Sequence, residues 1–364
     1  MNMKKFKRIG VLSSGGDAPG MNAAIRAITR KALDEGVEVM GIIGGYSGLI
    51  AEEMIPLTSA SVSNIITHGG TMLYSNRCPE FKTEEGIQKA VDTCKKHNID
   101  AIVAIGGDGT FRGATDLTLH GIPTIGVTGT IDNDITATDY TVGFDTAMNT
   151  ILETVDRLRD TCESHARCNI VEVMGRDCGQ LALMTGIASG AVAVCIPEIP
   201  FDEDDAVEEI LKAKAQGKRG MIIVVSEGVF AEDENGKKIP YGEVLKTRIA
   251  ERTGIETKFA RLAHIVRGGS PTLRDRLTAT KMGVKAVELL LEGKSNLVVI
   301  EDDGEITSLD IVFALTTDRM YKNKLKEGDL DKFSADEIKA MEAICEKRRV
   351  EIATLYKMAH EICR

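Results

Sequence analysis

The chain has 364 residues with 45 Lys and Arg against 55 Asp and Glu, so that its net charge is -10. This length suits two domains, and the acidic balance argues against a broad nucleic-acid-binding face. No apolar run approaches the ~18 residues of a membrane span, no signal peptide opens the chain, and the eight cysteines form no CxxC pair. We therefore expect a cytoplasmic protein with mostly buried cysteines that binds neither nucleic acid nor membrane.

Short apolar runs alternate with amphipathic segments, which predicts an α/β fold with parallel sheets. In chain order, strands are expected at 9–12, 37–43, 100–105, 123–127, 169–173, 191–196, 221–225 and 262–266, and helices at 21–33, 84–96, 112–119, 146–160, 180–190 and 202–215. A charged turn at 231–241, built on Asn235-Gly236, is expected to be a hairpin or loop.

Past residue 322, a capping box at Ser334 to Glu337 predicts one more helix. We expect this helix to pack on its own body or on a neighbouring subunit, with a regulatory role as the lesser alternative. Its apolar stripe comprises Ile338, Met341, Ile344, Ile352, Leu355, Tyr356, Ala359 and Ile362.

Six of the apolar runs end in loops that carry glycine together with Asp, Glu or Arg. Ligands bind beyond the carboxyl ends of parallel strands, so these loops predict one composite site. The turn from Ser13 to Gly20 precedes a helix, a geometry that binds phosphate on backbone N–H groups. The glycines of 106–110 let the backbone approach a polyphosphate, and Asp108 between them suits a magnesium ion.

The stretch Gly129-Thr130-Ile131-Asp132-Asn133-Asp134 places two carboxylates at a strand exit. One can take a proton from an attacking hydroxyl while the other orients it or holds a metal. A simple capped turn is the alternative, because Asp and Asn favour turns for local reasons. Together with arginines suited to phosphates, these acids predict phosphoryl transfer. The arginines are Arg77, Arg167, Arg176 and Arg267.

From about Lys7 to Leu291 the chain resembles the bacterial-type ATP-dependent 6-phosphofructokinases. The resemblance is carried in order by Gly15-Gly16-Asp17-Ala18-Pro19-Gly20-Met21-Asn22, the GGDGT loop, the stretch 129–134, Met174-Gly175-Arg176 and His264-Ile265-Val266-Arg267-Gly268-Gly269-Ser270-Pro271. It implies two similar α/β domains with mostly parallel, three-layer sheets and an active-site cleft between them. The expected ATP-binding domain is 1–143 plus about 262–312, the sugar-phosphate domain is 144–261 plus about 313–322, and 323–364 form a C-terminal helical extension.

The resemblance implies phosphorylation of fructose 6-phosphate to the 1,6-bisphosphate in glycolysis, using ATP and Mg²⁺, in a homo-oligomer (dimer or tetramer) with shared sites. Asp132 is the implied base and Asp108 the magnesium ligand, while Asp134 supports metal and base. The phosphates of ATP are assigned to Gly16, Arg77, Cys78, Gly107, Asp108, Gly109 and Thr110. The sugar is assigned to Thr130, Asp132, Met174, Gly175, Arg176 and Glu227, and its 6-phosphate to His264 and Arg267 with Arg167 and Lys258 of a neighbouring subunit.

The departures from the family pattern lie at a few positions. Lys258 stands where an Arg is usual. Lysine keeps the positive charge but cannot bind the phosphate through two parallel hydrogen bonds as a guanidinium does, unless Arg261 shares the role. Gly109 and Gly129 stand where pyrophosphate-using relatives carry Asp and Lys, which favours ATP. Arg26, Arg30, Arg159 and Lys218 match an effector site, but Ser59, Val192, Gln216 and Gly220 do not. The alternatives are a pyrophosphate donor, a sedoheptulose 7-phosphate acceptor, a nucleotide or lipid kinase, or a non-catalytic nucleotide-binding paralogue.

Overall fold

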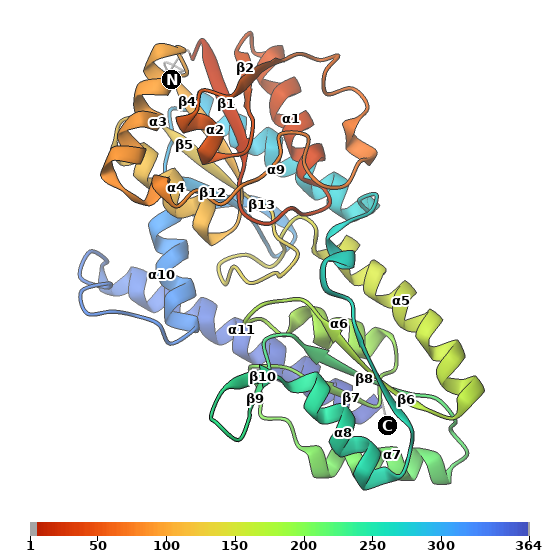
Figure 1. The fold of residues 1–364 in the computed structure, drawn as a ribbon. Coiled ribbons are helices and arrows are strands. Elements are labelled where there is room, and N and C mark those ends of the chain that lie inside the picture. The colour runs from red at the N-terminus through yellow and green to blue at the C-terminus, as the bar shows by residue number, and fades with distance from the viewer. Residues whose placement is uncertain (1–5, 363–364) are drawn as a thin grey trace. The chain divides into compact units, whose positions relative to one another are not determined.

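The computed structural model describes residues 6–362 and divides them into two compact units (Figure 1). The first unit comprises residues up to Ile131, Ile135–Thr146 and Arg267–Glu346. The second unit comprises Asp132–Asp134, Ala147–Val266 and the helix from Lys347 onward. Helices α5 (Phe144–His165) and α11 (Ala335–Ile362) each contribute residues to both. No helix within 6–362 is long and apolar enough to cross a membrane.

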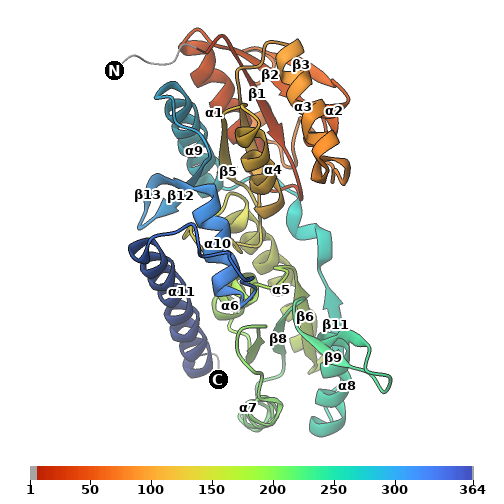
Figure 2. The same ribbon diagram turned by 90° about the vertical axis from the view of Figure 1, so that its left-hand side faces the viewer.

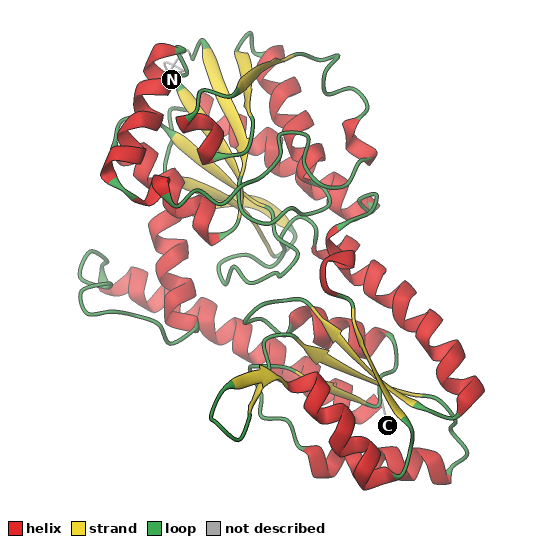
Figure 3. Ribbon diagram, in the orientation of Figure 1, coloured by secondary structure: helices red, strands yellow, loops and turns green. Residues whose placement is uncertain are grey.

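The first unit is built on a seven-stranded sheet in the order β13-β12-β5-β4-β1-β2-β3. Figure 3 shows the strands in yellow and the helices in red. Its central strands are parallel, as the alternating pattern predicts, and only the edge strands β3 and β13 run antiparallel. The strands are β1 (Arg8–Ser13), β2 (Glu38–Ile42), β3 (Met54–Leu57), β4 (Ala101–Gly106), β5 (Thr124–Thr128), β12 (Leu297–Asp302) and β13 (Glu305–Asp310).

Helices cover both faces of this sheet, which makes three layers (Figure 2). One face carries α1 (Met21–Asp34) and α9 (Leu273–Leu291), which pack on each other. The other face carries α2 (Tyr46–Ile50), α3 (Glu84–Lys96), α4 (Asp108–Leu119) and α10 (Ile311–Tyr321) over one apolar cluster. Because α10 packs on α4, β12 and β13, residues 313–321 belong to this unit, whereas the sequence assigned 313–322 to the second domain. The short 3₁₀ helices η1 (Ile65–Thr67) and η2 (Glu80–Lys82) complete the unit.

The second unit has a four-stranded, wholly parallel sheet in the order β11-β6-β8-β7. Its strands are β6 (Cys168–Val173), β7 (Ala193–Cys195), β8 (Met221–Ser226) and β11 (Thr257–Arg261). Helices α7 (Glu203–Ala215) and α8 (Tyr241–Thr253) share one apolar cluster with this sheet, and α6 (Gln180–Ala188) packs on β6, β7 and β8. The predicted hairpin forms from β9 (Phe230–Glu232) and β10 (Lys238–Pro240), with Gly236 at φ +74° in its turn.

The predicted strand at 262–266 is wrong. The strand in this region is β11, which ends at Arg261, and Ala263–Arg267 form the 3₁₀ helix η3. Leu262 and Val266 are buried, whereas Ile265 is 64% exposed. Buried positions four residues apart fit a helical turn and not the two-residue period of a strand. The GGDGT stretch also differs from a free loop, because α4 already begins at Asp108.

Helix α11 begins with the predicted capping box. The side chain of Ser334 donates to Glu337 Oε2 at 2.8 Å, and the Glu337 N–H donates back to Ser334 Oγ at 3.3 Å. Met341, Cys345, Ile352 and Ala359 are buried, so the helix packs on its own chain. Ile362, the last member of the predicted stripe, is 62% exposed instead.

A fully buried carboxylate, Asp275 in the first turn of α9, organises the segment that follows the two-carboxylate stretch. It accepts hydrogen bonds from Tyr140 Oη (2.5 Å), Gly143 N (2.6 Å), Thr146 N (2.8 Å) and Thr146 Oγ1 (2.5 Å). Burial raises the pKa of Asp275, and the hydrogen bonds from Thr146 and Tyr140 oppose that shift. The start of α5 is thereby tied to α9.

Replacing this carboxylate should destabilise the first unit. We expect Asp275→Ala to lower the free energy of unfolding by about 3 kcal/mol, because it leaves several buried donors without an acceptor. Urea unfolding measures the change. Lys281→Ala, an exposed position on the same helix, serves as control and should stay within about 0.5 kcal/mol. A loss below about 1 kcal/mol for Asp275→Ala would contradict the anchoring role.

Candidate active site

The carboxyl ends of β1 and β4, adjacent strands of the first sheet, are joined directly. Ser14 N donates to Ile105 O at 3.0 Å, and Thr110 Oγ1 donates to Ser14 O at 3.0 Å. Gly106 lies between them: a Cβ there would be 2.3 Å from Thr110 Oγ1. The close approach therefore requires glycine at 106 and brings the 13–20 turn beside the GGDGT stretch.

The next two glycines leave space at the start of α4. A Cβ at Gly109 would meet no atom within 4 Å, and one at Gly107 would meet only Thr130 Cβ at 4.0 Å. Asp108 lies between them in the first turn of the helix, with its side chain 24% exposed and one oxygen 4.0 Å from Arg112 Nη2. Open space, backbone N–H groups at a helix start and an accessible hard oxygen are what a polyphosphate with its magnesium ion requires.

Arg77 and Cys78 follow a segment that is tied to β1. Ser13 Oγ lies 2.7 Å from Thr71 Oγ1, and Ser75 Oγ donates to Gly15 O at 2.5 Å. Arg77 is exposed and Cys78 is half-buried. The structure thus brings this segment to the turn that contains Gly16.

The side chain of Arg267 packs against the turn 13–20, which contains Gly16. Its Nη1 donates to Asp17 O at 3.0 Å, and a Cβ at Gly16 would be only 2.7 Å from that nitrogen. Gly16 therefore leaves room for the guanidinium. The sequence assigned Gly16 to ATP and Arg267 to the sugar 6-phosphate, and the two residues are direct neighbours in the first unit.

The two-carboxylate stretch begins where β5 ends. Gly129 N donates to Gly106 O at 2.9 Å, and Thr141 Oγ1 donates to Thr130 O at 2.7 Å. Asp132 and Asn133 are buried, with 2% and 3% of their surface exposed. Asn133 has φ +48°, a left-handed conformation that Asn tolerates better than most residues.

Arg176 faces both carboxylates of this stretch within the second unit. Its Nε lies 4.0 Å from Asp132 Oδ2, and its Nη1 lies 3.6 Å from Asp134 Oδ2. Glu227, at the exit of β8, accepts from the backbone N–H groups of Gly175 (3.2 Å) and Arg176 (3.0 Å). The side chain of Arg176 is 63% exposed, so its positive charge stays accessible beside two nearly buried acids.

Arg167 and Lys258 meet at one carboxylate that sequence reasoning missed. Arg167 Nε lies 2.6 Å from Glu256 Oε2, and Lys258 Nζ lies 2.8 Å from Glu256 Oε1. Lys258, and after it Arg167, lower the pKa of Glu256 to about 2. Arg261, considered as a substitute for Lys258, instead contacts Glu172 at 2.5 Å and Glu243 at 3.1 Å.

The remaining predicted sugar ligands are placed by neighbouring elements of the second unit. Met174 is 9% exposed and directly follows β6. His264 is exposed in η3, and within residues 6–362 no hydrogen bond or ion pair joins it to Arg167 or Lys258.

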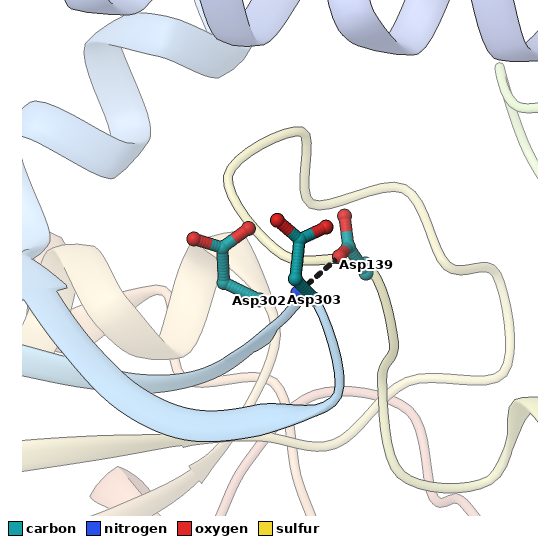
Figure 4. A group of neighbouring side chains, drawn as sticks. All are labelled: Asp139, Asp302 and Asp303. Carbon is teal, nitrogen blue, oxygen red and sulfur yellow. Dashed lines mark hydrogen bonds between the residues drawn. The ribbon is translucent and has the colours of Figure 1, made fainter.

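A separate group of acids, none of them a predicted metal ligand, lies in the first unit. Asp139 meets Asp302 and Asp303 of the β12–β13 turn, with carboxylate oxygens within 4.8 Å of one another (Figure 4). The Asp303 N–H donates to Asp139 Oδ2 at 2.8 Å, which gives this group a structural role in the turn. Exposed acids of this kind are common without a cation, and we assign no metal to them.

These features together define a phosphotransferase of the parallel α/β class. Strand ends with open glycine positions suit a nucleotide polyphosphate, and buried acids facing an accessible arginine suit transfer of a phosphoryl group. Comparison with known proteins identifies the family within this class.

The chain belongs to the phosphofructokinase family, because the family's sequence model matches residues 8–290. It is 51% identical over 322 residues to ATP-dependent 6-phosphofructokinase 1 of Clostridium perfringens, covering 88% of this chain and 98% of the relative. It is 50% identical over 310 residues to the ATP-dependent 6-phosphofructokinase of Halalkalibacterium halodurans, covering 85% and 94%. The phosphofructokinase of Saccharomyces cerevisiae superimposes with a TM-score of 0.81 at 32% identity, covering 93% of this chain but half of that chain.

The shared carboxylate Glu256 predicts a pH dependence of stability. Its pKa falls from an ordinary 4.5 to about 2 in the folded chain, so the stabilisation is present above about pH 4.5 and is lost as the pH falls toward 2. We expect the melting-temperature difference between the wild type and Glu256→Gln to be present at pH 6 and to shrink between pH 4.5 and pH 3.

High salt provides the matched control for this measurement. Because the pair is exposed, 1 M NaCl should reduce the difference at pH 6 by screening. A difference that stays constant from pH 6 to pH 3 would show that Glu256 is not held in its ionised form by these two cations.

Proposed function

We propose that the chain carries out the ATP-dependent phosphorylation of fructose 6-phosphate that its relatives' names describe, with Asp132 as the general base. The family match supports the reaction itself, as does the 50–51% identity over 94–98% of the length of two ATP-dependent 6-phosphofructokinases. One observation supports the residue assignment: the guanidinium of Arg176 lies next to the carboxylates of Asp132 and Asp134.

In this mechanism Asp132 takes the proton from the sugar 1-hydroxyl. The oxygen forms a bond to the γ-phosphorus while the bond from that phosphorus to the β-bridging oxygen breaks, which releases ADP. Arg176 offsets charge on the transferring group, since its guanidinium is accessible and lies beside the base. Asp134 and Thr130 hold the turn and the sugar in register with the base.

ATP is assigned to the first unit. Its phosphates would contact the N–H groups of Gly16 and of 107–110, with Arg77 and Cys78 beside them. Asp108 would hold Mg²⁺, and the ion, when bound, neutralises charge on the phosphates. The space at Gly109 supports a nucleotide donor, because a carboxylate there would repel an α-phosphate. Gly129 supports it too: a Cβ there would lie 3.1 Å from Ile105 and 3.2 Å from Met21, so a lysine would disturb the core.

Fructose 6-phosphate is assigned to Thr130, Asp132, Met174, Gly175, Arg176 and Glu227, with His264 and Arg267 on its 6-phosphate. Arg167 and Lys258 would reach the 6-phosphate of a neighbouring subunit, so we propose a homo-oligomer, a dimer or tetramer, in the cytoplasm. Their pairing with Glu256 supports this, because it orients both cations on the surface of the second unit. Phosphate binding would then replace contacts with a carboxylate.

Removing the base should slow turnover greatly without unfolding the chain. Asp132→Ser should lower kcat by about 10²–10⁴-fold, the usual contribution of a positioned base. A coupled assay of ADP release with fructose 6-phosphate measures the rate. Asp156→Ser, an exposed carboxylate on α5, is the matched control and should keep kcat within about twofold. Near-normal turnover of Asp132→Ser would rule out this base.

The choice of donor is tested at the open glycine. Gly109→Asp should lower kcat/KM for ATP by about 100-fold, because a carboxylate within about 4 Å of a phosphate costs a few kcal/mol of repulsion. Gly109→Ala places a Cβ in open space and should stay within about threefold, which separates charge from bulk. Full activity of Gly109→Asp with ATP would place the α-phosphate elsewhere.

A further inference from the structure

The segment that carries Arg77 has no regular secondary structure to fix its path. Residues 68–79 lie between the 3₁₀ helices η1 and η2 and form neither helix nor strand. Backbone N–H and C=O groups that belong to no helix or sheet need other hydrogen-bond partners when they are buried. The partners of 68–72 therefore decide how the chain approaches Arg77.

One side chain of α1 supplies three of these hydrogen bonds. Asn22, the second residue of α1, is only 2% exposed. Its Nδ2 donates to His68 O at 3.0 Å and to Gly69 O at 3.2 Å, and its Oδ1 accepts from Met72 N at 2.7 Å. The amide thus uses both of its donors and its acceptor on one stretch of backbone, which fixes that stretch against α1.

The backbone between this stretch and Arg77 follows an unfavourable path. Tyr74 has φ +55°, a left-handed conformation that is costly for a residue with a large side chain and persists only where the surroundings impose it. Tyr74 is 67% exposed, so burial of its ring does not impose the conformation. The bonds from Asn22 to 68–72 and from Ser13 Oγ to Tyr74 O (3.0 Å) supply the constraint. We expect a released segment to relax at Tyr74 and to displace Arg77.

We infer that Asn22 is a positioning residue for ATP binding: it holds the backbone of 68–72 and thereby sets the place of Arg77. Arg77 is exposed, and within residues 6–362 its side chain makes no hydrogen bond or ion pair. The backbone of its own segment therefore determines where its guanidinium lies. Asn22 is buried and acts through Arg77. This inference rests on the proposed contact between Arg77 and the phosphates of ATP.

The experiment is a double-mutant cycle between Asn22→Ala and Arg77→Ala in the full chain. Arg77→Ala removes a charged phosphate contact and should raise KM for ATP about 50-fold. Asn22→Ala should raise it about tenfold, because the contact is displaced and not removed. The double variant should stay within about twofold of Arg77→Ala, since both changes affect the same interaction. KM for fructose 6-phosphate should stay within about threefold in Asn22→Ala, because Arg267 is held separately by Asp17 O.

Hydrogen exchange of the backbone amides gives a readout that does not depend on turnover. The Met72 N–H is bonded to Asn22 Oδ1, so it should exchange at least about tenfold faster in Asn22→Ala. In Arg77→Ala the exchange of this amide should stay as in the wild type, because the bonds from Asn22 are intact. The comparison separates release of the segment from loss of the guanidinium.

Asn296→Ala is the matched control, because Asn296 also makes side-chain hydrogen bonds within the first unit. It accepts from Thr115 Oγ1 at 2.9 Å and donates to Asp310 Oδ2 at 2.8 Å, and neither partner is assigned to ATP. Asn296→Ala should lower the melting temperature but leave KM for ATP within about twofold. Asn22→Ser, whose side chain is too short to reach both ends of 68–72, replaces Asn22→Ala if that variant does not fold, with the same expected results.

The inference is overturned if Asn22→Ala keeps KM for ATP within about twofold of wild type, or if its effect and that of Arg77→Ala multiply in the double variant. It is overturned as well if exchange at Met72 is unchanged, or if Asn296→Ala raises KM for ATP as much as Asn22→Ala does. An unchanged KM for ATP in Arg77→Ala would overturn it together with the assignment of Arg77. These results are distinct from a failure of the proposed base, which would appear as near-normal turnover by Asp132→Ser.

Discussion

The hydrogen bond from Gly129 N to Gly106 O is the contact on which the arrangement of the first unit's functional loops depends. It joins the ends of β5 and β4, so that the stretch with Asp132 leaves the sheet at the point where the GGDGT stretch begins. Neither residue can carry a side chain without moving its neighbours, because a Cβ at Gly106 would strike Thr110 and one at Gly129 would press on Ile105 and Met21. Parallel pairing then aligns these ends with that of β1.

The three Arg and Lys side chains of the second unit that we assign to phosphates already lie beside carboxylates. Arg176 faces Asp132 and Asp134, and Arg167 and Lys258 share Glu256. These pairs hold long side chains in place within an acidic protein, so less conformational freedom is lost when an anion binds. They also make selection stricter, because an anion must compete with a carboxylate for the same donors.

The sequence predicted the parallel α/β architecture, the phosphofructokinase family, and the bounds of the helices it proposed to within about five residues. It did not predict the helices α2, α8, α9 and α10. Helix α3 has the expected bounds, and Thr83 caps it with an acceptor for Gly86 N at 3.1 Å. The signal failed at 262–266, where apolar residues resemble a strand but Leu262 and Val266 are buried at helical spacing. The roles of individual site residues stay predictions, because position alone does not test them.

What the sequence determined by itself was local: periodicity set the helices and strands, and glycine turns with acids marked the strand exits. Only the tertiary structure decided which distant side chains meet. Asp275 binds residues about 130 positions earlier in the chain, and Glu256 binds Arg167 from 89 positions away. Nothing in the residues around Asp275 or Glu256 encodes these partners, because they depend on strand order and helix packing. The two-carboxylate stretch was visible in the sequence, but what holds it in place was not.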